Sequence, residues 1–370
     1  MSELNVSTQN GHSRDGLNGA THARTKLRGV GVVGLGYWGP NHIRNLYHLG
    51  CAEQVYACDL DAKRRDNIHS LYPGVTPLVE FNDLLGRDEV EAIVVATPVS
   101  AHYSMALAAL RRGKSVLVEK PLAMSRREAL ELIKTAHANN CVLMVGHTFE
   151  YSAPVRKIRD LLESGELGEV FYINSTRVNL GLFQRDVNVA WDLATHDISI
   201  ITMLLGRAPV AVSCQGHSHY RDRTEDVALL TLDFGNNVVA FVHVSWLDPN
   251  KIRRTTIVGS RKMLVYDDTA TQEKIRIYDK GVTVLPYYET FGQFQLSYRY
   301  GDIHVPRVEE SEPLKVECEH FVECILSGAT PLTDGMSGLR VVSVLEAANE
   351  SLRSGGRPVP VARPEDEIDE

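Results

Sequence analysis

The amino-acid sequence predicts an α/β protein of two domains. We expect a Rossmann domain with a doubly wound parallel sheet, followed by an α/β domain with a large, mostly antiparallel open sheet. The chain has 370 residues, more than the ~250–300 at which a single hydrophobic core stops growing. Short apolar strands alternate with helical patterns over residues 27–148, as in a parallel sheet with crossover helices. Over residues 149–360 several segments alternate apolar with polar residues, which is typical of antiparallel strands.

The elements expected in the first domain follow from local patterns. Ala92–Thr97 is continuously apolar, as in a parallel strand covered on both faces. Ser125 and Glu128 have the spacing of a capping box, so a helix is expected to begin there and to continue to Ala138. The other expected elements are the strands Gly29–Val33, Gln54–Asp59, Ser115–Glu119 and Cys141–Val145, and the helices Pro40–Leu49 and Ala101–Arg112.

The second domain is expected to pack a few helices against the open sheet. The run Gly235–Asn237 predicts a hairpin turn, because glycine and asparagine tolerate positive φ. The expected helices are Pro154–Glu163, Trp191–Leu205 and Gly338–Arg353, and the expected strands are Val210–Ser218, Val227–Phe234, Val238–Trp246, Arg254–Val258 and Met263–Tyr266. Residues 1–26 are expected to form a flexible tail and residues 361–370 an acidic one.

Composition and charge exclude several classes of protein. The net charge of −8 argues against nucleic-acid and membrane-surface partners, which both require a basic face. The six cysteines form no C-x-x-C pair, and His217 and His219 lack further ligands, so neither a disulfide framework nor a metal site is expected. Residues 1–26 contain no apolar segment typical of a signal peptide, and no run approaches the ~18 apolar residues of a membrane span. We therefore expect a cytoplasmic protein.

A dinucleotide fingerprint lies between the first strand and the first helix. In Gly34-Leu35-Gly36-Tyr37-Trp38-Gly39, the first glycine permits the tight turn and the second lets the backbone approach a pyrophosphate. The third lets helix and strand pack closely, with the phosphates at the helix N-terminus. Asp59, at the end of the second strand, is placed to accept hydrogen bonds from a ribose diol. Its charge would repel a 2′-phosphate, so NAD is favoured; NADP stays open because Arg64 and Arg65 are near.

Three side chains are candidates for proton chemistry. Glu119-Lys120-Pro121 ends a Rossmann strand, at the sheet edge where ligands bind, although a lysine there can also be a solvated surface charge. Asp192 and His196 are four residues apart on a predicted helix and share one face. A carboxylate that fixes the tautomer of a histidine is a general-base arrangement. The alternative is a buried Asp–His pair without chemistry.

Together these motifs resemble the Gfo/Idh/MocA oxidoreductase family over residues 27–360. The resemblance implies hydride transfer at a sugar or cyclitol carbinol carbon. It also implies that Lys120 and His196 carry the proton chemistry, supported by Asp192. We expect His196 to be the base and Lys120 to polarise the forming carbonyl, with the reverse assignment open. The expected cofactor contacts are Gly34, Gly36, Tyr37, Trp38, Gly39, Asp59, Thr97, Pro98, His102, Glu119 and Lys120.

Longer stretches, including Gly36–Asn45, Gly146–Tyr151 and Arg177–Ile200, resemble the family branch that oxidises nucleotide sugars such as UDP-N-acetylglucosamine and its uronic acid at C3. Substrate contacts are then expected from Arg156, Lys157, Arg177, Asn179 and Asn188, the last three in an irregular segment over the crevice. For Arg156, a surface pair with Asp160 is the alternative. The competing functions are an inositol or free-sugar dehydrogenase and a non-catalytic dinucleotide sensor. By analogy with the family, we expect a homodimer or homotetramer.

Overall fold

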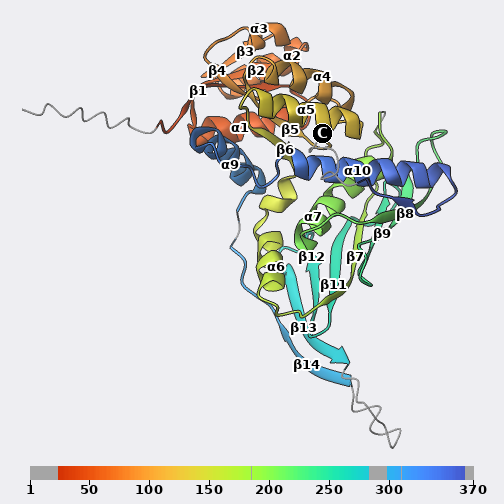
Figure 1. Ribbon diagram of the computed structural model, residues 1–370. Helices are drawn as coiled ribbons and strands as arrows, with labels where there is room; N and C mark the ends of the chain where they lie inside the picture. The colour runs from red at the N-terminus through yellow and green to blue at the C-terminus, as the bar shows by residue number, and fades with distance from the viewer. Residues whose placement is uncertain (1–23, 185, 283–297, 310, 363–370) are drawn as a thin grey trace, which may run out of the picture.

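The computed structural model describes residues 24–184, 186–282, 298–309 and 311–362. Most of the two predicted tails, residues 1–23 and 363–370, lies outside the described residues. Two sheets lie one beyond the other along an elongated molecule, with helix α10 (Gly335–Arg353) between them (Figure 1). The predicted fold class, a Rossmann domain followed by an α/β domain with an open sheet, is confirmed.

The first sheet is parallel, with the strand order β3-β2-β1-β4-β5-β6. Its order reverses between β1 and β4, so a crevice forms at the carboxyl ends of these strands. Each predicted element of this domain is present to within two residues. The strands are β1 (Leu27–Val33), β2 (Ala52–Cys58), β3 (Val75–Leu78), β4 (Val90–Val95), β5 (Ser115–Glu119) and β6 (Leu143–Gly146), and the helices are α1 (Gly39–Leu49), α2 (Ala62–Leu71), α3 (Phe81–Leu85), α4 (Val99–Leu110) and α5 (Arg126–Ala138).

The unpredicted elements β3, α2 and α3 have little apolar pattern. Helix α2 buries Ile68 alone among its ten residues, and the four-residue β3 contains Pro77. Such an edge strand buries too little surface to leave a periodic signal in the sequence. The capping box of α5 is present in altered form: Ser125 accepts from the Glu128 amide, but the Glu128 carboxylate accepts from the Met124 amide and not from Ser125.

The second sheet has the order β14-β13-β12-β11-β7-β10-β9-β8-β15, and β7 and β10 are its one parallel pair among the described strands. Gly235, Asn236 and Asn237 all have positive φ, which confirms the predicted hairpin turn between β9 and β10. The strands are β7 (Val170–Val178), β8 (Ala211–His217), β9 (Val227–Asp233), β10 (Val239–Ser245), β11 (Ile252–Gly259), β12 (Met263–Asp267), β13 (Ile275–Val282), β14 (Tyr298–His304) and β15 (Val359–Pro360).

Strand β7 is central to this sheet and was not predicted. Its residues Asn174–Arg177 are all polar, so the sequence hides the alternation between buried and exposed positions. Ser175 and Arg177 point into the protein, where they bond to Asp197. The prediction that Arg177 lies in an irregular segment is therefore wrong, because polar residues with buried partners occupy a strand position that is normally apolar.

Helices cover one face of the second sheet and leave the other open. They are α6 (Ala153–Glu163), α7 (Thr195–Leu205) and α10, and α7 continues from a π-helical segment, η2 (Ala190–Ala194), within the predicted helix Trp191–Leu205 (Figure 1). Leu229, Phe241 and Tyr172 are exposed on the opposite face. Helix α9 (Pro313–Ser327) instead packs its apolar residues into the Rossmann core beside α1, so the end of the chain returns to the first domain.

The connection between the domains contains a buried carboxyl group. After β6 the chain passes through the short helix η1 (Thr148–Tyr151). Glu150 of this helix is buried and accepts a hydrogen bond from Ser199 of α7. Burial raises the pKa of Glu150 from 4.5 to about 7, against the opposing effect of the Ser199 hydroxyl. The folded state therefore binds a proton that the unfolded state releases between these two pH values.

We expect Glu150→Gln to stabilise the protein at pH 8, where the wild-type carboxylate is ionised and buried. The gain should be on the order of 2–3 kcal/mol and should shrink as the pH falls toward 5. Thermal melts of both proteins from pH 5 to 8 measure it. Because other buried carboxyl groups titrate equally in both proteins, the difference between them isolates Glu150. Parallel melting curves across this range would contradict the assignment.

Candidate active site

A cleft of about 920 Å³ runs from the carboxyl edge of the Rossmann sheet to the second domain. Both domains contribute side chains, and the cleft brings together residues that are far apart in the sequence. The predicted residues that line it are Gly34, Gly36, Tyr37, Trp38, Asp59, Thr97, Pro98, Lys120, Asn179, Asp192 and His196. The glycine turn, Lys120 and His196 thus border one continuous space.

The glycine turn between β1 and α1 has the geometry that the fingerprint requires. Gly34 has a φ of 91°, which is favourable for glycine. A Cβ atom at Gly39 would lie 2.0 Å from the carbonyl oxygen of Gly34, so helix and strand can pack this closely only without one. A Cβ at Gly36 would meet nothing within 4 Å, because this position faces the open cleft. The backbone there is free for a pyrophosphate.

Asp59 follows β2 at the rim of the cleft and supports the same turn. Its carboxylate accepts hydrogen bonds from the amides of Leu35, at 2.7 Å, and Asp61, at 2.8 Å. Partial burial works in the other direction, but these amides and Arg64 together lower the pKa of Asp59. The carboxylate is therefore ionised at neutral pH and lies in the cleft, where it can accept from a ribose.

The ends of β4 and β5 are joined by buried polar contacts. His102 of α4 lies between two carbonyl oxygens, with Nδ1 2.8 Å from Pro121 and Nε2 2.9 Å from Thr97. Glu119 pairs with His42 of α1, with 2.7 Å between Oε1 and Nε2. His102 and Glu119 thus position the strand ends beside the cleft, and the sequence-predicted role of each as a cofactor contact stays a prediction.

Lys120 is held by the second domain. Its Nζ donates to the backbone oxygen of Asp192 at 2.8 Å and to Oδ1 of the same residue at 3.2 Å. The other carboxylate oxygen, Oδ2, accepts from the indole N–H of Trp246 at 3.0 Å. The expected hydrogen bond between Asp192 and His196 is therefore absent: both carboxylate oxygens of Asp192 are already engaged, one by an ammonium and one by an indole.

His196 lies against an aromatic ring instead. Its imidazole contacts Phe149, with 4.9 Å between ring centroids, and its buried Nδ1 has no partner among the described residues. Burial lowers the pKa of His196 well below 6.5, and the charges of Lys120 and Arg177 add to this shift. The ring is consequently neutral at neutral pH and able to accept a proton.

The predicted substrate residues lie in four different places. Asn179 lines the cleft, whereas Arg177 is buried in an ion pair with Asp197 and is not among the cleft-lining residues. Asn188 lies before η2, where its side chain accepts from the Trp191 amide and donates to Glu225. The structure thus gives Asn188 a local structural role.

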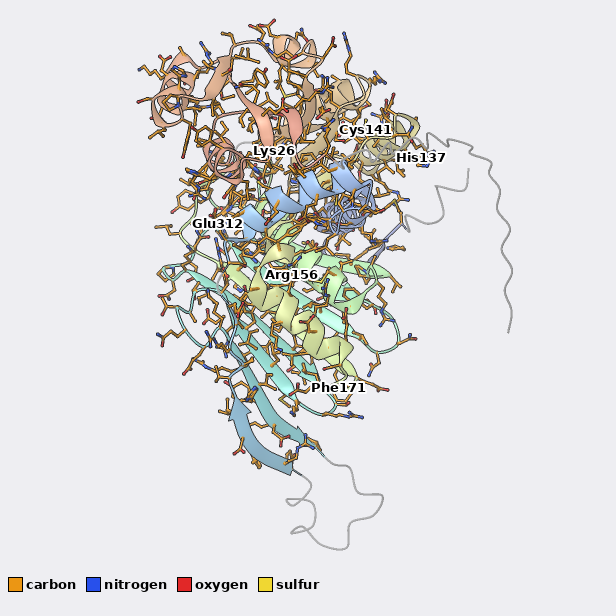
Figure 2. All side chains as sticks on the ribbon, turned by 90° about the vertical axis from the view of Figure 1, so that its left-hand side faces the viewer. Lys26, His137, Cys141, Arg156, Phe171 and Glu312 are labelled. Atoms are coloured by element: carbon orange, nitrogen blue, oxygen red, sulfur yellow. The ribbon has the colours of Figure 1, made fainter. Side chains whose placement is uncertain are left out.

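Arg156 and Lys157 lie on α6, in the layer that covers the second sheet, and neither is among the residues that line the cleft (Figure 2). Arg156 stacks on Tyr151, with its guanidinium carbon 5.9 Å from the ring centroid. The prediction that these two residues contact the substrate is not supported by their position. A cation on a helix surface leaves the same signal in a sequence as one in a site, so the pattern alone could not separate them.

Among the cleft residues that sequence reasoning missed are Trp246 and Arg253, which both carry a hydrogen-bond donor. Trp246 ends a predicted strand, Val238–Trp246. Arg253 precedes the predicted start of β11. Both lie in the cleft because β10 and β11 flank β7 in the sheet, and this strand order cannot be obtained from local patterns.

Two family models match the chain. Residues 28–147 match the oxidoreductase family with an NAD-binding Rossmann fold, GFO_IDH_MocA, and residues 155–265 match the GFO/IDH/MocA C-terminal domain. The chain belongs to the Gfo/Idh/MocA oxidoreductase family. This Gfo/Idh/MocA protein is thus an oxidoreductase whose cofactor is NAD, which the glycine turn and the ionised Asp59 fit.

Individual relatives in the family are distant. UDP-N-acetylglucosamine 3-dehydrogenase of Acidithiobacillus ferrooxidans is 25% identical over 337 residues, 87% of this chain and 95% of the relative. scyllo-Inositol 2-dehydrogenase (NAD(+)) of Bacillus subtilis is 23% identical over 336 residues, 88% of this chain and 94% of the relative. The solved WlbA dehydrogenase from Bordetella pertussis, in complex with NADH and UDP-GlcNAcA, is 19% identical with a TM-score of 0.73, covering 91% of this chain and 98% of that one. At this identity it shows a shared fold.

The described residues contain no group of three or more His, Cys, Asp or Glu side chains that could hold a metal ion. None of the described helices is long and apolar enough to cross a membrane.

Alanine at two positions of the glycine turn should separate cofactor binding from folding. We expect Gly36→Ala to melt like the wild type but to bind NAD about tenfold more weakly, because its methyl group enters the space kept for the pyrophosphate. Gly39→Ala should lower the melting temperature, because its methyl group overlaps the Gly34 carbonyl. Calorimetric NAD titrations and thermal melts measure both effects. Unchanged NAD affinity in Gly36→Ala would show that the pyrophosphate lies elsewhere.

Trp246→Phe tests the hydrogen bond that orients Asp192. The substitution keeps an aromatic ring and removes the N–H donor, so one carboxylate oxygen loses its partner and the Lys120 ammonium is less well placed. We expect kcat to fall about tenfold or more, corresponding to ~1.4 kcal/mol in the barrier, with NAD affinity unchanged. Steady-state kinetics and NAD titration together make the measurement. If the variant instead lost both NAD affinity and thermal stability, the substitution would have damaged packing in general.

Proposed function

We propose that this protein oxidises a secondary hydroxyl group of a nucleotide-activated sugar of the UDP-N-acetylglucosamine class, at C3, with NAD as the hydride acceptor. One observation carries the proposal: the Lys120 ammonium and the His196 imidazole line the same cleft as the glycine turn. A hydroxyl group that lies between these two side chains would have a proton acceptor on one side and a cationic donor on the other.

His196 is the proposed general base and Lys120 the proposed polarising group. His196 is buried and neutral, so it can take the hydroxyl proton without first losing one of its own. The Lys120 ammonium donates to two oxygens of Asp192, which leaves one of its three N–H groups for the substrate oxygen. NAD, when bound, supplies the acceptor for the hydride that leaves the carbon. Asp192 and Trp246 are positioning residues in this scheme.

The proposed substrate class is supported by two of the family members described above. The Acidithiobacillus relative acts by name on UDP-N-acetylglucosamine, and the Bordetella structure contains UDP-GlcNAcA. The scyllo-inositol dehydrogenase of Bacillus is similar over nearly the same length of chain, which keeps a free polyol as the second candidate. The two differ in whether turnover depends on the nucleotide.

The proposal also includes the site of action and the assembly. We propose that the protein acts in the cytoplasm as a homodimer or homotetramer. The open face of the second sheet, with Tyr172, Leu229 and Phe241 exposed, supports association between copies.

A substrate panel and two variants test the activity. Reduction of NAD is followed by its absorbance with UDP-N-acetylglucosamine, its uronic acid, free N-acetylglucosamine and inositols. Lys120→Met and His196→Asn should each lower kcat by on the order of 10²–10⁴ while NAD still binds. Arg156→Gln on α6 is the control, and its activity should equal that of the wild type. Wild-type turnover in both Lys120→Met and His196→Asn would refute the mechanism, and turnover of inositols alone would refute the nucleotide-sugar substrate.

A further inference from the structure

Two arginines face each other across neighbouring strands of the second sheet. Arg253 of β11 and Arg177 of β7 are direct cross-strand partners. Both guanidinium carbons lie close to the Phe149 ring, at 4.6 Å from its centroid for Arg177 and 5.7 Å for Arg253. Each guanidinium also has one carboxylate partner, Asp197 for Arg177 and Asp268 for Arg253.

The two guanidinium groups differ in exposure and share one side of the sheet. Arg177 is buried and binds Asp197 through Nε and Nη2, while its buried Nη1 has no partner among the described residues. Arg253 is partly exposed and lines the cleft. Of the five N–H donors of a guanidinium, Arg253 uses one, from Nη1 to Asp268 at 3.2 Å, within the described structure. The remaining donors of Arg253 are therefore available to a ligand in the cleft, and Arg177 lies buried next to it.

The pair lies next to the proposed base. The Phe149 ring that contacts both arginines also contacts the His196 imidazole. Arg253 comes from the second domain, as do Asn179 and Trp246 in the same cleft, whereas the glycine turn and Asp59 belong to the Rossmann domain. A group bound by Arg253 thus belongs to the substrate and not to the adenosine half of the dinucleotide.

We infer that Arg253, with Arg177 behind it, binds an anionic group of the substrate, a carboxylate or a phosphate, beside the carbon that is oxidised. The planar guanidinium matches either group with two parallel hydrogen bonds. This inference rests on the proposed function, because it takes the ligand of the cleft to be a sugar. It adds that the sugar carries a negative charge close to the reacting hydroxyl.

The charges around His196 give such an anion a second effect. After burial, the positive charges of Lys120, Arg177 and Arg253 contribute to lowering the pKa of His196. A bound anion offsets these charges and raises the pKa of the imidazole, so the ring accepts a proton more readily in the substrate complex than in the free protein. A charged substrate would thus be both better bound and better deprotonated than its neutral analogue.

Arg253→Gln, with Arg254→Gln as its matched control, tests the inference. Arg254 is the next residue of β11, is exposed, and points to the open face of the sheet, away from Arg253. UDP-N-acetylglucosamine carries a neutral hydroxymethyl group where its uronic acid carries a carboxylate. If Arg253 binds this carboxylate, Arg253→Gln should lower kcat/KM for the UDP-linked uronic acid about tenfold or more. The kcat/KM for UDP-N-acetylglucosamine should stay nearly unchanged.

The panel also distinguishes the two sources of charge. If Arg253 binds a phosphate, the variant should lose about tenfold on both UDP-sugars and nothing on free N-acetylglucosamine. Arg253→Lys keeps the charge without the fork and should fall between the wild type and Arg253→Gln. The inference is overturned if a sugar is oxidised and Arg253→Gln equals Arg254→Gln on every substrate.

Failure of the proposed function would have a different outcome. In that case no sugar of the panel reduces NAD, and binding is measured instead, by calorimetric titration of the NAD-loaded proteins with the UDP-linked uronic acid. Affinity about tenfold weaker in Arg253→Gln than in Arg254→Gln supports the anion site without any turnover. The inference is overturned if the two variants bind the UDP-linked uronic acid with equal affinity. It is also overturned if neither the variants nor the wild type bind it. Melting temperatures of the variants identify a folding defect, and Arg253→Lys then replaces Arg253→Gln.

Discussion

The candidate active site depends on one contact between the two domains, the hydrogen bonds from Lys120 to Asp192. Lys120 follows the last residue of β5, and Asp192 lies in the π-helical segment before α7. An ammonium has three N–H groups, and Asp192 engages it through both a backbone oxygen and a carboxylate oxygen. The interaction that joins the domains at this point is therefore the same one that orients the proposed polarising group. Trp246 fixes the second carboxylate oxygen, so the sheet of the second domain also bears on the orientation of Lys120.

Several polar side chains are buried around this contact. Glu119 with His42, His102 with two carbonyl oxygens, and Glu150 with Ser199 all lie in the interior near the strand ends or the domain connection. Burying such groups costs free energy unless they are paired. His102 joins the segments that follow β4 and β5, and Glu150 joins η1 to α7. Nδ1 of His196 is one of several buried polar atoms in this region without a partner among the described residues, together with Oγ1 of Thr97 and both ring nitrogens of His147.

The sequence predicted what is encoded locally. The glycine fingerprint, Asp59 and Lys120 each follow a strand directly, so their place at the carboxyl edge could be inferred from the alternation of strands and helices alone. The partner of Asp192 could not be inferred in this way. Helical spacing predicts that Asp192 and His196 share a face, and both do line the cleft, but Lys120 and Trp246 compete for the carboxylate from other parts of the chain.

Local patterns were equally unable to predict that Arg177 and Arg253 lie side by side. Arg177 and Arg253 are 76 residues apart in the sequence and are neighbours because β11 pairs with β7. Register between distant strands is a property of the whole sheet, so no local window could bring these two residues together. Arg156 and Lys157 illustrate the opposite error, because a basic helix segment near a conspicuous motif carries no information about which layer of the fold it occupies.

The double use of Asp59 constrains how this protein could change its cofactor preference. A replacement that accommodates the 2′-phosphate of NADP must remove the negative charge, yet the same carboxylate accepts the Leu35 and Asp61 amides and so holds the turn on which the pyrophosphate is expected to lie. A small apolar residue at position 59 would make room for the 2′-phosphate, but it would also remove the hydrogen-bond acceptor that holds the glycine turn. Conversion by a single substitution is thus opposed by the backbone, and a workable switch requires a neutral acceptor at position 59 together with the guanidinium of Arg64, already within reach of the site.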